Sequence, residues 1–400
     1  MCVKSFVPTR SGMRPVRRKY LAAFILSLAV VILSWGAVFH FSAIQQVAKD
    51  IKTNSTVDPH KGKPGKAEIL EMANFSPDQT KHRYLIYTCR LTQYCGGLSD
   101  RLRGIAYAFL LAVITRRRFG VHMELPTCEL SSMLEVNHLD WRVNITSLDE
   151  SNLTSQVYNR VNNVSIRKEF MTIDFNTYFD KDIVYYTSNQ ILFRELFANP
   201  HHLADLGWLT KVPQGEIFRQ ILNTLFKLAP SLQSEVDNIT DQAHRRHGGG
   251  MLVAAQLRCG RNPSIPKDTQ VRLVPEDLQV IWKFLKSYLA NPAASFFIAS
   301  DSEEVVREAK SKFRERLLES SGPIVHVAYS KNSDDVCSGM RRVLVDIHVL
   351  AASDVLLVTR SGIGDLASHL RGFDKGGLYC FRPHDARVTA LNITVNWLCR

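Results

Sequence analysis

The segment that decides the fold is Val253-Ala254-Ala255-Gln256-Leu257-Arg258-Cys259-Gly260-Arg261. A short, nearly continuous apolar run of this kind is typical of a strand that is buried on both faces of a parallel sheet. The run begins at Met251 and ends abruptly at an arginine, Arg258. The segment therefore predicts a central strand that carries polar side chains at its carboxyl end.

Strands and helices alternate on the C-terminal side of the chain. The hydrophobic pattern predicts strands at residues 251–257, 295–300, 324–327, 355–360 and 377–381. It predicts helices at residues 275–289, 302–313, 339–352 and 363–371. Such alternation is typical of a parallel sheet whose strands are joined by crossover helices.

The N-terminal side repeats this order less cleanly. We expect a strand at 84–89, a Gly-Gly turn, a helix at 98–115, a strand at 119–125, an exposed insertion at 130–167 and a helical region at 190–228. Three successive glycines at 248–250 predict a flexible joint between two domains. We therefore predict an α/β fold with two Rossmann-like domains that face a cleft, one at 83–247 and one at 248–400.

An apolar segment precedes both domains. Residues 20–41 read YLAAFILSLAVVILSWGAVFHF, and about 20 such residues in a helix cross the roughly 30 Å hydrocarbon layer of a membrane. The basic residues before it orient the N-terminus to the cytosol. We expect a cytosolic tail at 1–19, a signal anchor at 20–41 and a lumenal stem at 42–82. A cleaved signal peptide is the alternative, but its apolar region is normally only about 7–15 residues long.

The charge of the chain has a local origin. The 400 residues are 45% hydrophobic and 22% charged, which is the composition of a globular protein. The formal net charge is +12, but six of these charges lie in the first nineteen residues, so the rest of the chain carries +6. This mild excess is compatible with a phosphate-bearing ligand and argues against a nucleic-acid partner.

Sequons and cysteines agree with a lumenal location. The acceptor sequons for N-glycosylation are Asn54, Asn74, Asn144, Asn152, Asn163, Asn238 and Asn392. Seven of the eight cysteines also follow the predicted anchor, and an odd number leaves at least one thiol unpaired or paired between chains. The cysteines form no CxxC motif or Cys/His array, so we expect no metal site.

Ligands of doubly wound sheets bind beyond the carboxyl ends of the strands, and four segments place polar residues there. In the first segment, glycines open a helix and Asp100 and Arg101 are expected to face the cleft. In the second, Arg258 offers a planar fork to a diphosphate, and Gln256 lies on the same strand face. The candidate residues of all four segments are Gly96, Gly97, Asp100, Arg101, Gln256, Arg258, Asp301, Ser302, Arg360, Ser361, Gly362 and Asp365.

These segments carry a resemblance to a known family. GGLSDRLRG at 96–104, the strand end Gln256-Leu257-Arg258, the segment at 298–302 and TRSGIGDLA at 359–367 resemble, in this order, motifs of GDP-fucose-dependent fucosyltransferases. This superfamily includes α1,2-, α1,6- and protein O-fucosyltransferases, and the resemblance covers roughly residues 84–380. Many members begin the second motif with histidine, where this chain has Gln256, so the acceptor and the linkage stay open.

The resemblance implies a GT-B fold, with an N-terminal acceptor-side domain and a C-terminal domain that binds the sugar nucleotide. It also implies an inverting transfer of fucose from GDP-fucose to a glycan or glycoprotein, with no cofactor and no required metal. Arg258 and the turn around Ser361 would then stabilise the departing GDP, and Asp100 is the candidate general base. With the anchor and the sequons, the resemblance places the protein in the Golgi membrane as a single-pass type II protein.

Three alternatives stay open. A metal-dependent glycosyltransferase would need an Asp-x-Asp motif after a strand, but Asp180-Lys181-Asp182 precedes one. A Golgi sulfotransferase, or a transferase with another sugar donor, would share the anchor and the α/β pattern. A lectin-like Golgi protein without catalysis would explain the anchor and the glycans but not polar residues at four strand ends.

Overall fold

The computed structural model describes residues 82–399 except 127, 151, 164, 261–269, 327–333, 373–374 and 392–398. All of these belong to one compact unit, residues 64–400. The predicted cytosolic tail, the signal anchor and the stem up to residue 81 lie outside the described residues. Within the described part, no helix combines the length and the apolar character that crossing a membrane requires.

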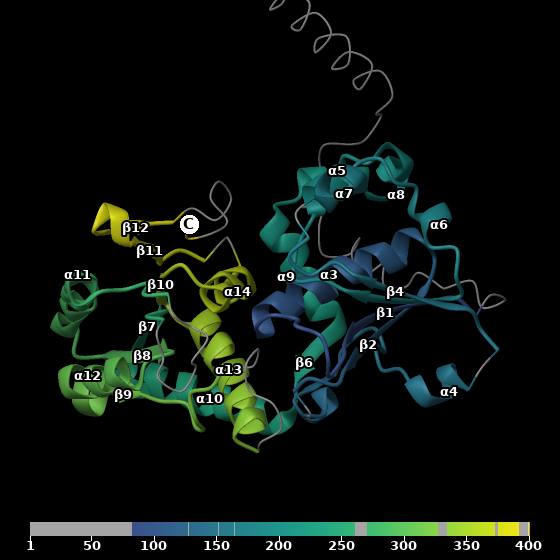
Figure 1. Cartoon of the computed structure of the whole chain (residues 1–400). Helices are drawn as coiled ribbons and strands as arrows, with labels where there is room; N and C mark the ends of the chain where they lie inside the picture. Colours follow the sequence, from purple (N-terminus) through teal and green to yellow (C-terminus); the bar gives the residue numbers. More distant parts are fainter. Residues whose placement is uncertain are drawn as a thin grey trace, which may run out of the picture. The chain divides into compact units, whose positions relative to one another are not determined.

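The first sheet has four parallel strands in the order β2-β1-β5-β4 (Figure 1). They are β1 (Tyr84–Cys89), β2 (Arg118–Met123), β4 (Ser155–Asn159) and β5 (Ile183–Thr187). Helix α3 (Leu98–Ile114) connects β1 to β2 and buries most of its residues, as its apolar spacing predicts. The five residues of the edge strand β4 lie inside the predicted exposed insertion, where the sequence analysis predicted no strand. Four of them are exposed, and the segment therefore lacks the buried alternation of a strand.

Short elements surround this sheet. They are η1 (Leu130–Ser132), β3 (Leu134–Val136), α4 (Ile145–Asp149), α5 (Ile166–Phe170), α6 (Phe175–Tyr178), α7 (Phe193–Phe197), η2 (Pro200–His202), α8 (Leu203–Leu206), η3 (Gly207–Lys211), α9 (Gln214–Leu225) and β6 (Phe226–Leu228). The predicted helical region is thus a series of short helices that ends in α9. Strands β3 and β6 pair antiparallel. We call the four-stranded sheet with the elements up to β6 the N-terminal lobe.

The second sheet has six strands in the order β12-β11-β10-β7-β8-β9, with β7 (Met251–Leu257) near its centre. The others are β8 (Ala294–Ser300), β9 (Leu317–Leu318), β10 (Val355–Val358), β11 (Leu378–Arg382) and β12 (Arg387–Ala390). All neighbours are parallel except β11 and β12. The strand predicted at 324–327 does not form over its described residues, 324–326, and β9 takes the edge position instead. Strand β12 follows the strand that was predicted to be the last.

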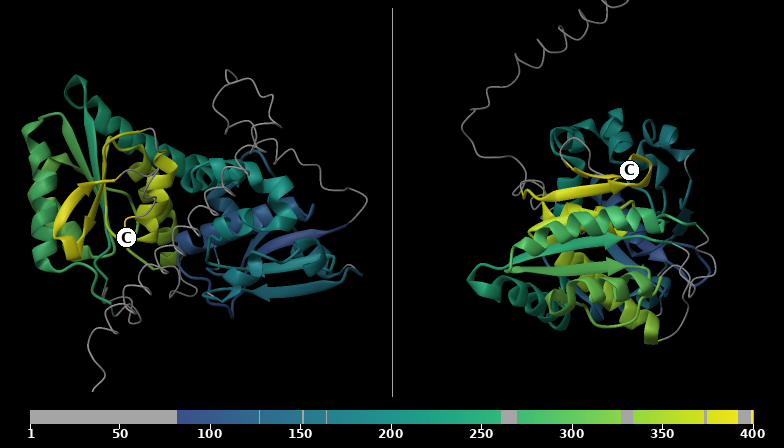
Figure 2. Two further views of the ribbon diagram at one scale, coloured as in Figure 1. Left: turned by 90° about the horizontal axis from the view of Figure 1, so that it is seen from above. Right: turned by 90° about the vertical axis from the view of Figure 1, so that its left-hand side faces the viewer.

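Helices cover both faces of the second sheet. They are α10 (Pro230–Arg245), α11 (Pro275–Lys286), α12 (Glu303–Phe313), α13 (Asp334–Ala352) and α14 (Gly362–Arg371), with the 3-10 turns η4 (Arg246–Gly248), η5 (Ser287–Ala290), η6 (Arg314–Arg316) and η7 (Pro383–Asp385). We call this sheet with α10 to α14 the C-terminal lobe. The two sheets occupy different halves of the described unit in the left view of Figure 2.

Alternate residues of β7 belong to different cores, as the strand period of two requires. Leu252 and Ala254 join a large core that continues into the N-terminal lobe. Val253, Ala255 and Leu257 join a second core, which includes residues of α11 and α12. Both faces of β7 are therefore buried, which confirms the prediction of a central parallel strand.

The two lobes contact each other directly. The disulfide Cys128–Cys337 joins the segment after β2 to α13, and α14 contacts both α3 and α9. Helix α10 packs on α13 and β7, so the chain changes sheets before α10, ahead of the three glycines at 248–250. The domain division at residues 247 and 248 stays a prediction.

Candidate functional site

A pocket of about 430 Å³ lies where the carboxyl ends of β7, β8 and β10 meet the start of α3. Its wall also includes residues of α13 and of the segment 323–326. This is the crevice in which ligands of doubly wound sheets bind, and its volume is typical of small-molecule sites. The residues that line it come from all four predicted segments.

Arg258 stands at the end of β7 and lines the pocket. One guanidinium nitrogen, Nη1, lies 2.6 Å from Asp301 Oδ2, and both side chains are mostly buried, with 15% and 12% exposure. Asp301 also accepts hydrogen bonds from the backbone nitrogens of Cys259 (2.7 Å) and Gly260 (2.8 Å). Asp301 therefore holds the turn after β7 and orients Arg258, while both side chains remain in the pocket wall.

Gln256 lies two residues earlier and also lines the pocket. Its side chain is 4% exposed, and its Oε1 accepts no hydrogen bond from any residue that the structure describes. A buried acceptor without a donor costs free energy, so this atom is suited to accept a hydrogen bond from a ligand. A Cβ atom at Gly364 would lie 2.8 Å from the same oxygen, so α14 approaches Gln256 closely because residue 364 is glycine.

The start of α14 forms a further part of the wall. Ser361 caps the helix by accepting a hydrogen bond from Ile363 N at 3.2 Å. Arg360, which is exposed, and Gly362 line the pocket beside it. The N-terminus of a ten-residue helix adds a partial positive charge at this point.

The start of α3 supplies the opposite wall. Gly97 and Asp100 line the pocket, and Asp100 Oδ2 accepts a hydrogen bond from Gly97 N at 3.1 Å. Ser99 Oγ donates to Gly362 O at 2.7 Å, and a Cβ atom at Gly362 would lie 2.7 Å from that same Oγ. Glycine at 362 therefore allows the two lobes to approach closely at the pocket.

Asp365 forms an ion pair across the lobes. Its Oδ2 lies 2.9 Å from Nη2 of Arg103, and its side chain is only 7% exposed. The second nitrogen of Arg103 lies 3.5 Å from Asp100 Oδ1. Asp365 thus lines the pocket as predicted, and its observed contact is with the other lobe.

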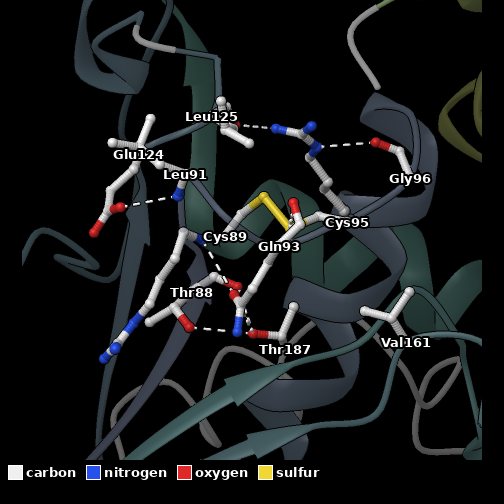
Figure 3. Close-up of a disulfide and its surroundings, with 12 residues drawn as sticks. Thr88, Cys89, Leu91, Gln93, Cys95, Gly96, Glu124, Leu125, Val161 and Thr187 are labelled. Atoms are coloured by element: carbon white, nitrogen blue, oxygen red, sulfur yellow. Dashed lines mark hydrogen bonds between the residues drawn. A yellow bond between two sulfur atoms is a disulfide. The ribbon is translucent and has the colours of Figure 1, made fainter. Parts of the chain in front are cut away.

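The structure does not bring three predicted residues into the pocket. Arg101 is 2% exposed and donates from Nε to Gly96 O at 3.1 Å and from Nη1 to Leu125 O, so the expectation that it faces the cleft is wrong. Burial lowers the pKa of Arg101. Gly96 serves the turn, with φ at +76°, next to the disulfide Cys89–Cys95 that Figure 3 shows. Ser302 caps α12 and does not line the pocket.

Five charged or titratable residues of the wall were missed by the sequence analysis: Arg103, Arg272, His326, Arg342 and Asp346. Burial raises the pKa of Asp346 to about 6, while a hydrogen bond from Ser320 and the charge of Arg342 oppose this shift. Arg342 and Asp346 stand four residues apart on α13, which is a helical spacing that places both on one face. That spacing was readable, but nothing in the sequence indicated that this face meets the pocket.

The wall holds five arginines and four aspartates, so it has a small positive excess. Arg103, Arg258 and Arg342 lie near the carboxylates of Asp365, Asp301 and Asp346. Arg272 and Arg360 form no ion pair with the described residues. The pocket therefore fits an anionic ligand that engages several guanidinium groups.

The remaining candidates lie elsewhere. Among the described residues, no group of three His, Cys, Asp or Glu side chains could hold a metal ion. Asp182 of the Asp-Lys-Asp sequence directly precedes β5 and accepts hydrogen bonds from Thr154, which directly precedes β4. Asn144, Asn152 and Asn238 are exposed, Asn163 is half-buried, and none of the four lines the pocket. Asn54, Asn74 and Asn392 lie outside the described residues.

The cysteines form three disulfides: Cys89–Cys95, Cys128–Cys337 and Cys380–Cys399. Cys259 is free, and burial raises the pKa of its thiol to about 11. The thiol is therefore protonated at neutral pH and is a poor nucleophile.

Comparisons with known proteins find similarity in structure alone. No protein-family model and no curated protein sequence matches the chain. The fold is similar to FUT1 of Arabidopsis thaliana, a fucosyltransferase solved as an arginine-to-lysine variant with GDP, with a TM-score of 0.54 and 14% identity over 81% of this chain and 77% of that one. A second match is NodZ, an α-1,6-fucosyltransferase crystallised with GDP, with a TM-score of 0.44 and 11% identity over 78% of this chain and 99% of that one. A third is POFUT1 with GDP, with a TM-score of 0.37 and 12% identity over 75% of this chain and 99% of that one. The likeness to FUT1 shows a shared fold and confirms the α/β architecture with parallel sheets.

Proposed function

We propose that this protein is an inverting fucosyltransferase that transfers fucose from GDP-fucose to a hydroxyl group of a glycan or glycoprotein. The observation that carries the proposal is the pocket at the carboxyl ends of β7, β8 and β10, with Arg258 at its wall and an excess of guanidinium groups around it. A fold shared with GDP-bound FUT1 supports guanosine diphosphate as the nucleotide.

Arg258 would donate two parallel hydrogen bonds to the diphosphate, with Asp301 fixing the direction of its fork. The start of α14 and Arg360 would hold further phosphate oxygens. These groups would stabilise the negative charge that develops on the leaving GDP, so the reaction would need no metal.

Asp346 is suited to select the base. A carboxylate accepts hydrogen bonds through both oxygens, and guanine offers two adjacent N–H donors on one edge. Uracil and adenine do not offer such a pair of donors. The buried position of Asp346 in the pocket wall supports this role.

The transfer is a single displacement. The acceptor oxygen would form a bond to the anomeric carbon of fucose while the bond from that carbon to the β-phosphate oxygen of GDP breaks. Asp100 would take the proton of the acceptor hydroxyl, because its carboxylate lies in the opposite wall with 37% side-chain exposure. Inversion at the anomeric carbon follows from one displacement.

The cellular location is part of the proposal. The apolar segment at 20–41 and the sequons support a type II protein of the Golgi membrane with its catalytic part in the lumen. Three disulfides within the described residues support an oxidising compartment.

The test uses the full-length protein from a host with an oxidising secretory pathway, so that its disulfides form. Calorimetric titration with GDP, UDP and adenosine 3′,5′-bisphosphate measures nucleotide affinity. Turnover of GDP-fucose, GDP-mannose and UDP-N-acetylglucosamine is then measured with and without EDTA.

The proposal predicts that GDP binds more tightly than the other nucleotides by about tenfold or more, and that GDP-fucose is turned over in EDTA. Preference for adenosine 3′,5′-bisphosphate would indicate a sulfotransferase instead. Turnover of another sugar nucleotide would correct the donor. Glycan binding without any nucleotide affinity would indicate a lectin-like protein and would refute the proposed activity.

A further inference from the structure

Strand β4 leaves one side of the first sheet open. It pairs with β5, and the described residues form no strand on its other side. Ile183 N donates to Thr154 O at 2.9 Å and Arg160 N donates to Thr187 O at 2.8 Å, so the even-numbered residues of this segment bond to β5. Successive residues of a strand turn their backbone groups to opposite sides. The backbone groups of three residues therefore point to the open side: Ser155, Val157 and Asn159.

The side chains of β4 do not protect this open side. Natural proteins usually block an open edge with a charged residue or a proline, and β4 contains neither. Four of its five residues are exposed, and Val157 is 44% exposed. The charged residue that follows β4, Arg160, is bound elsewhere, because its guanidinium lies 5.7 Å from the centroid of the Tyr158 ring and donates to Tyr178 Oη. An edge of this kind can pair with another chain.

A hollow of about 600 Å³ runs along the same strand. It is lined by the five successive residues 156–160, and Thr177, Tyr178 and Asp180 form its other wall. The side chains of successive strand residues alternate between the two faces of a sheet, so a hollow lined by all five follows the edge of the strand and not one face. The open backbone groups of β4 are therefore accessible to a second strand or to a sugar chain.

Two of the predicted glycosylation sites flank β4. Asn152, which is exposed, lies three residues before the strand, and Asn163, which is half-buried, lies four residues after it. Thr154 completes the first sequon and donates to Asp182 Oδ2 from its backbone nitrogen at 2.9 Å and from its hydroxyl group at 2.7 Å. Asn163 N donates to Arg160 O at 3.4 Å. These contacts hold one sequon at each end of the open edge.

Without a cover, β4 matches the same strand of a second copy of the chain. A two-fold axis at Val157 would pair this residue with itself and would pair Ser155 with Asn159, so all three outward residues would exchange backbone hydrogen bonds. No like charges would meet in this pairing, because β4 is uncharged. Edge-to-edge pairing of this kind is a route to aggregation, which a secreted or lumenal protein has to avoid.

We propose that N-linked glycans on Asn152 and Asn163 cover the open edge of β4 and prevent it from pairing with a second copy of this chain. An N-glycan is bulky and soluble, and a strand of five residues is only about 17 Å long, so one glycan at each end leaves no room for another strand. This inference goes beyond the transfer reaction. It depends on the proposed lumenal location and not on the identity of the donor.

The test uses the full-length protein from a secretory host, with Val157→Cys as a reporter of pairing. In the two-fold arrangement the Cα atoms of residue 157 in the two copies would lie about 5.5 Å apart, a separation that a disulfide spans. Mild oxidation then converts paired molecules into a covalent dimer, which is measured on a non-reducing gel. Met171→Cys is the matched control, because Met171 is 42% exposed and lies outside β4. Mass spectrometry of glycopeptides measures the occupancy of Asn152 and Asn163.

We expect both asparagines to carry glycans and the Val157→Cys protein to stay monomeric on oxidation. Adding Asn152→Gln and Asn163→Gln should increase the covalent dimer by at least about tenfold, because the backbone hydrogen bonds of the pairing together exceed one tenfold factor in association. Trimming the glycans of the folded Val157→Cys protein with an endoglycosidase should also increase the dimer. Asn238→Gln, which removes an exposed sequon on α10, should have no effect.

Four outcomes would overturn the inference: unoccupied asparagines, no increase in dimer after the glycans are removed, an equal increase with Met171→Cys as the reporter, or an equal increase with Asn238→Gln. Calorimetric titration of the same proteins with GDP keeps the two proposals apart. A glycan-covered edge in a protein without GDP affinity would support this inference and refute the donor. GDP-fucose turnover by a protein whose Asn152 and Asn163 are unoccupied would do the reverse.

Discussion

Replacement of Arg258 by alanine tests the site most directly. The free energy of unfolding should fall only moderately, because Asp301 keeps its hydrogen bonds from Cys259 N and Gly260 N. Removing one partner of a fully buried ion pair costs about 3–5 kcal/mol, and the retained bonds should lower this cost to about 2 kcal/mol. The main effect should be on activity, because the guanidinium is the group that would meet the charge developing on the leaving GDP.

The loss of activity can be estimated. Removing one pre-oriented donor from the stabilisation of a transition state lowers kcat by about 10²–10³-fold. A hydrogen bond to a charged group contributes about 1.5–3 kcal/mol to binding, so GDP affinity should fall by about 10–150-fold. Initial rates of GDP release and calorimetric titration with GDP measure the two effects, and thermal unfolding monitors the fold.

Arg219→Ala is the matched control. Arg219 pairs with Glu216 in α9, their side chains are 24% and 9% exposed, and Glu216 keeps a hydrogen bond from Gln220 at 2.7 Å. This variant should lose a similar amount of stability and no GDP affinity, since neither partner lines the pocket. GDP affinity within about threefold of the parent in Arg258→Ala, or an equal loss in Arg219→Ala, would refute the role of Arg258.

Three further predictions follow from other contacts. Asp346→Asn should raise the free energy of unfolding by up to about 3 kcal/mol above pH 6 and by nothing below pH 4. The folded protein holds the pKa of Asp346 at about 6, against an ordinary value of 3.8, so the parent loses stability as the pH rises between these two values. Urea titrations at pH 4 and pH 7 check this, and the same variant should bind GDP more weakly. Replacing both Cys128 and Cys337 by serine should cost up to about 5 kcal/mol, because the disulfide closes a loop of 209 residues, and a thermal shift of under one degree in calorimetry would contradict this. Gly362→Ala should lower stability by about 1–3 kcal/mol, because its Cβ would lie 2.7 Å from Ser99 Oγ, and unfolding in denaturant measures the change.

Most strands and long helices were predictable from local pattern. Strands β1, β7, β8 and β10 are largely apolar because both of their faces are buried, and α12 starts directly after its capping residue, Ser302. The elements that the sequence did not predict are strands that depend on contacts with distant parts of the chain. Strand β4 is largely exposed, and β9 has only two residues, so pairing with a neighbour defines them more than their own composition does.

The site was predictable where it follows a strand and not where it comes from a helix surface. Gln256, Arg258 and Asp301 stand at strand ends, and parallel strands bring such residues together. Arg342 and Asp346 lie in the middle of α13, and only tertiary packing directs them to the pocket. Arg101 shows the opposite error, because a charged side chain near the cleft was expected to face it and instead binds two buried carbonyl groups.

The disulfide Cys128–Cys337 has a consequence for biosynthesis. Cys89 and Cys95 are six residues apart, so they can join as soon as the start of the N-terminal lobe has been made. Cys128 has to wait until more than two hundred further residues have been synthesised and α13 has folded onto its partner. During that interval its thiol is open to exchange with the earlier pair. The late stages of translation therefore decide whether the correct disulfides form. The state of the Cys128–Cys337 bond reports whether the two lobes have come together.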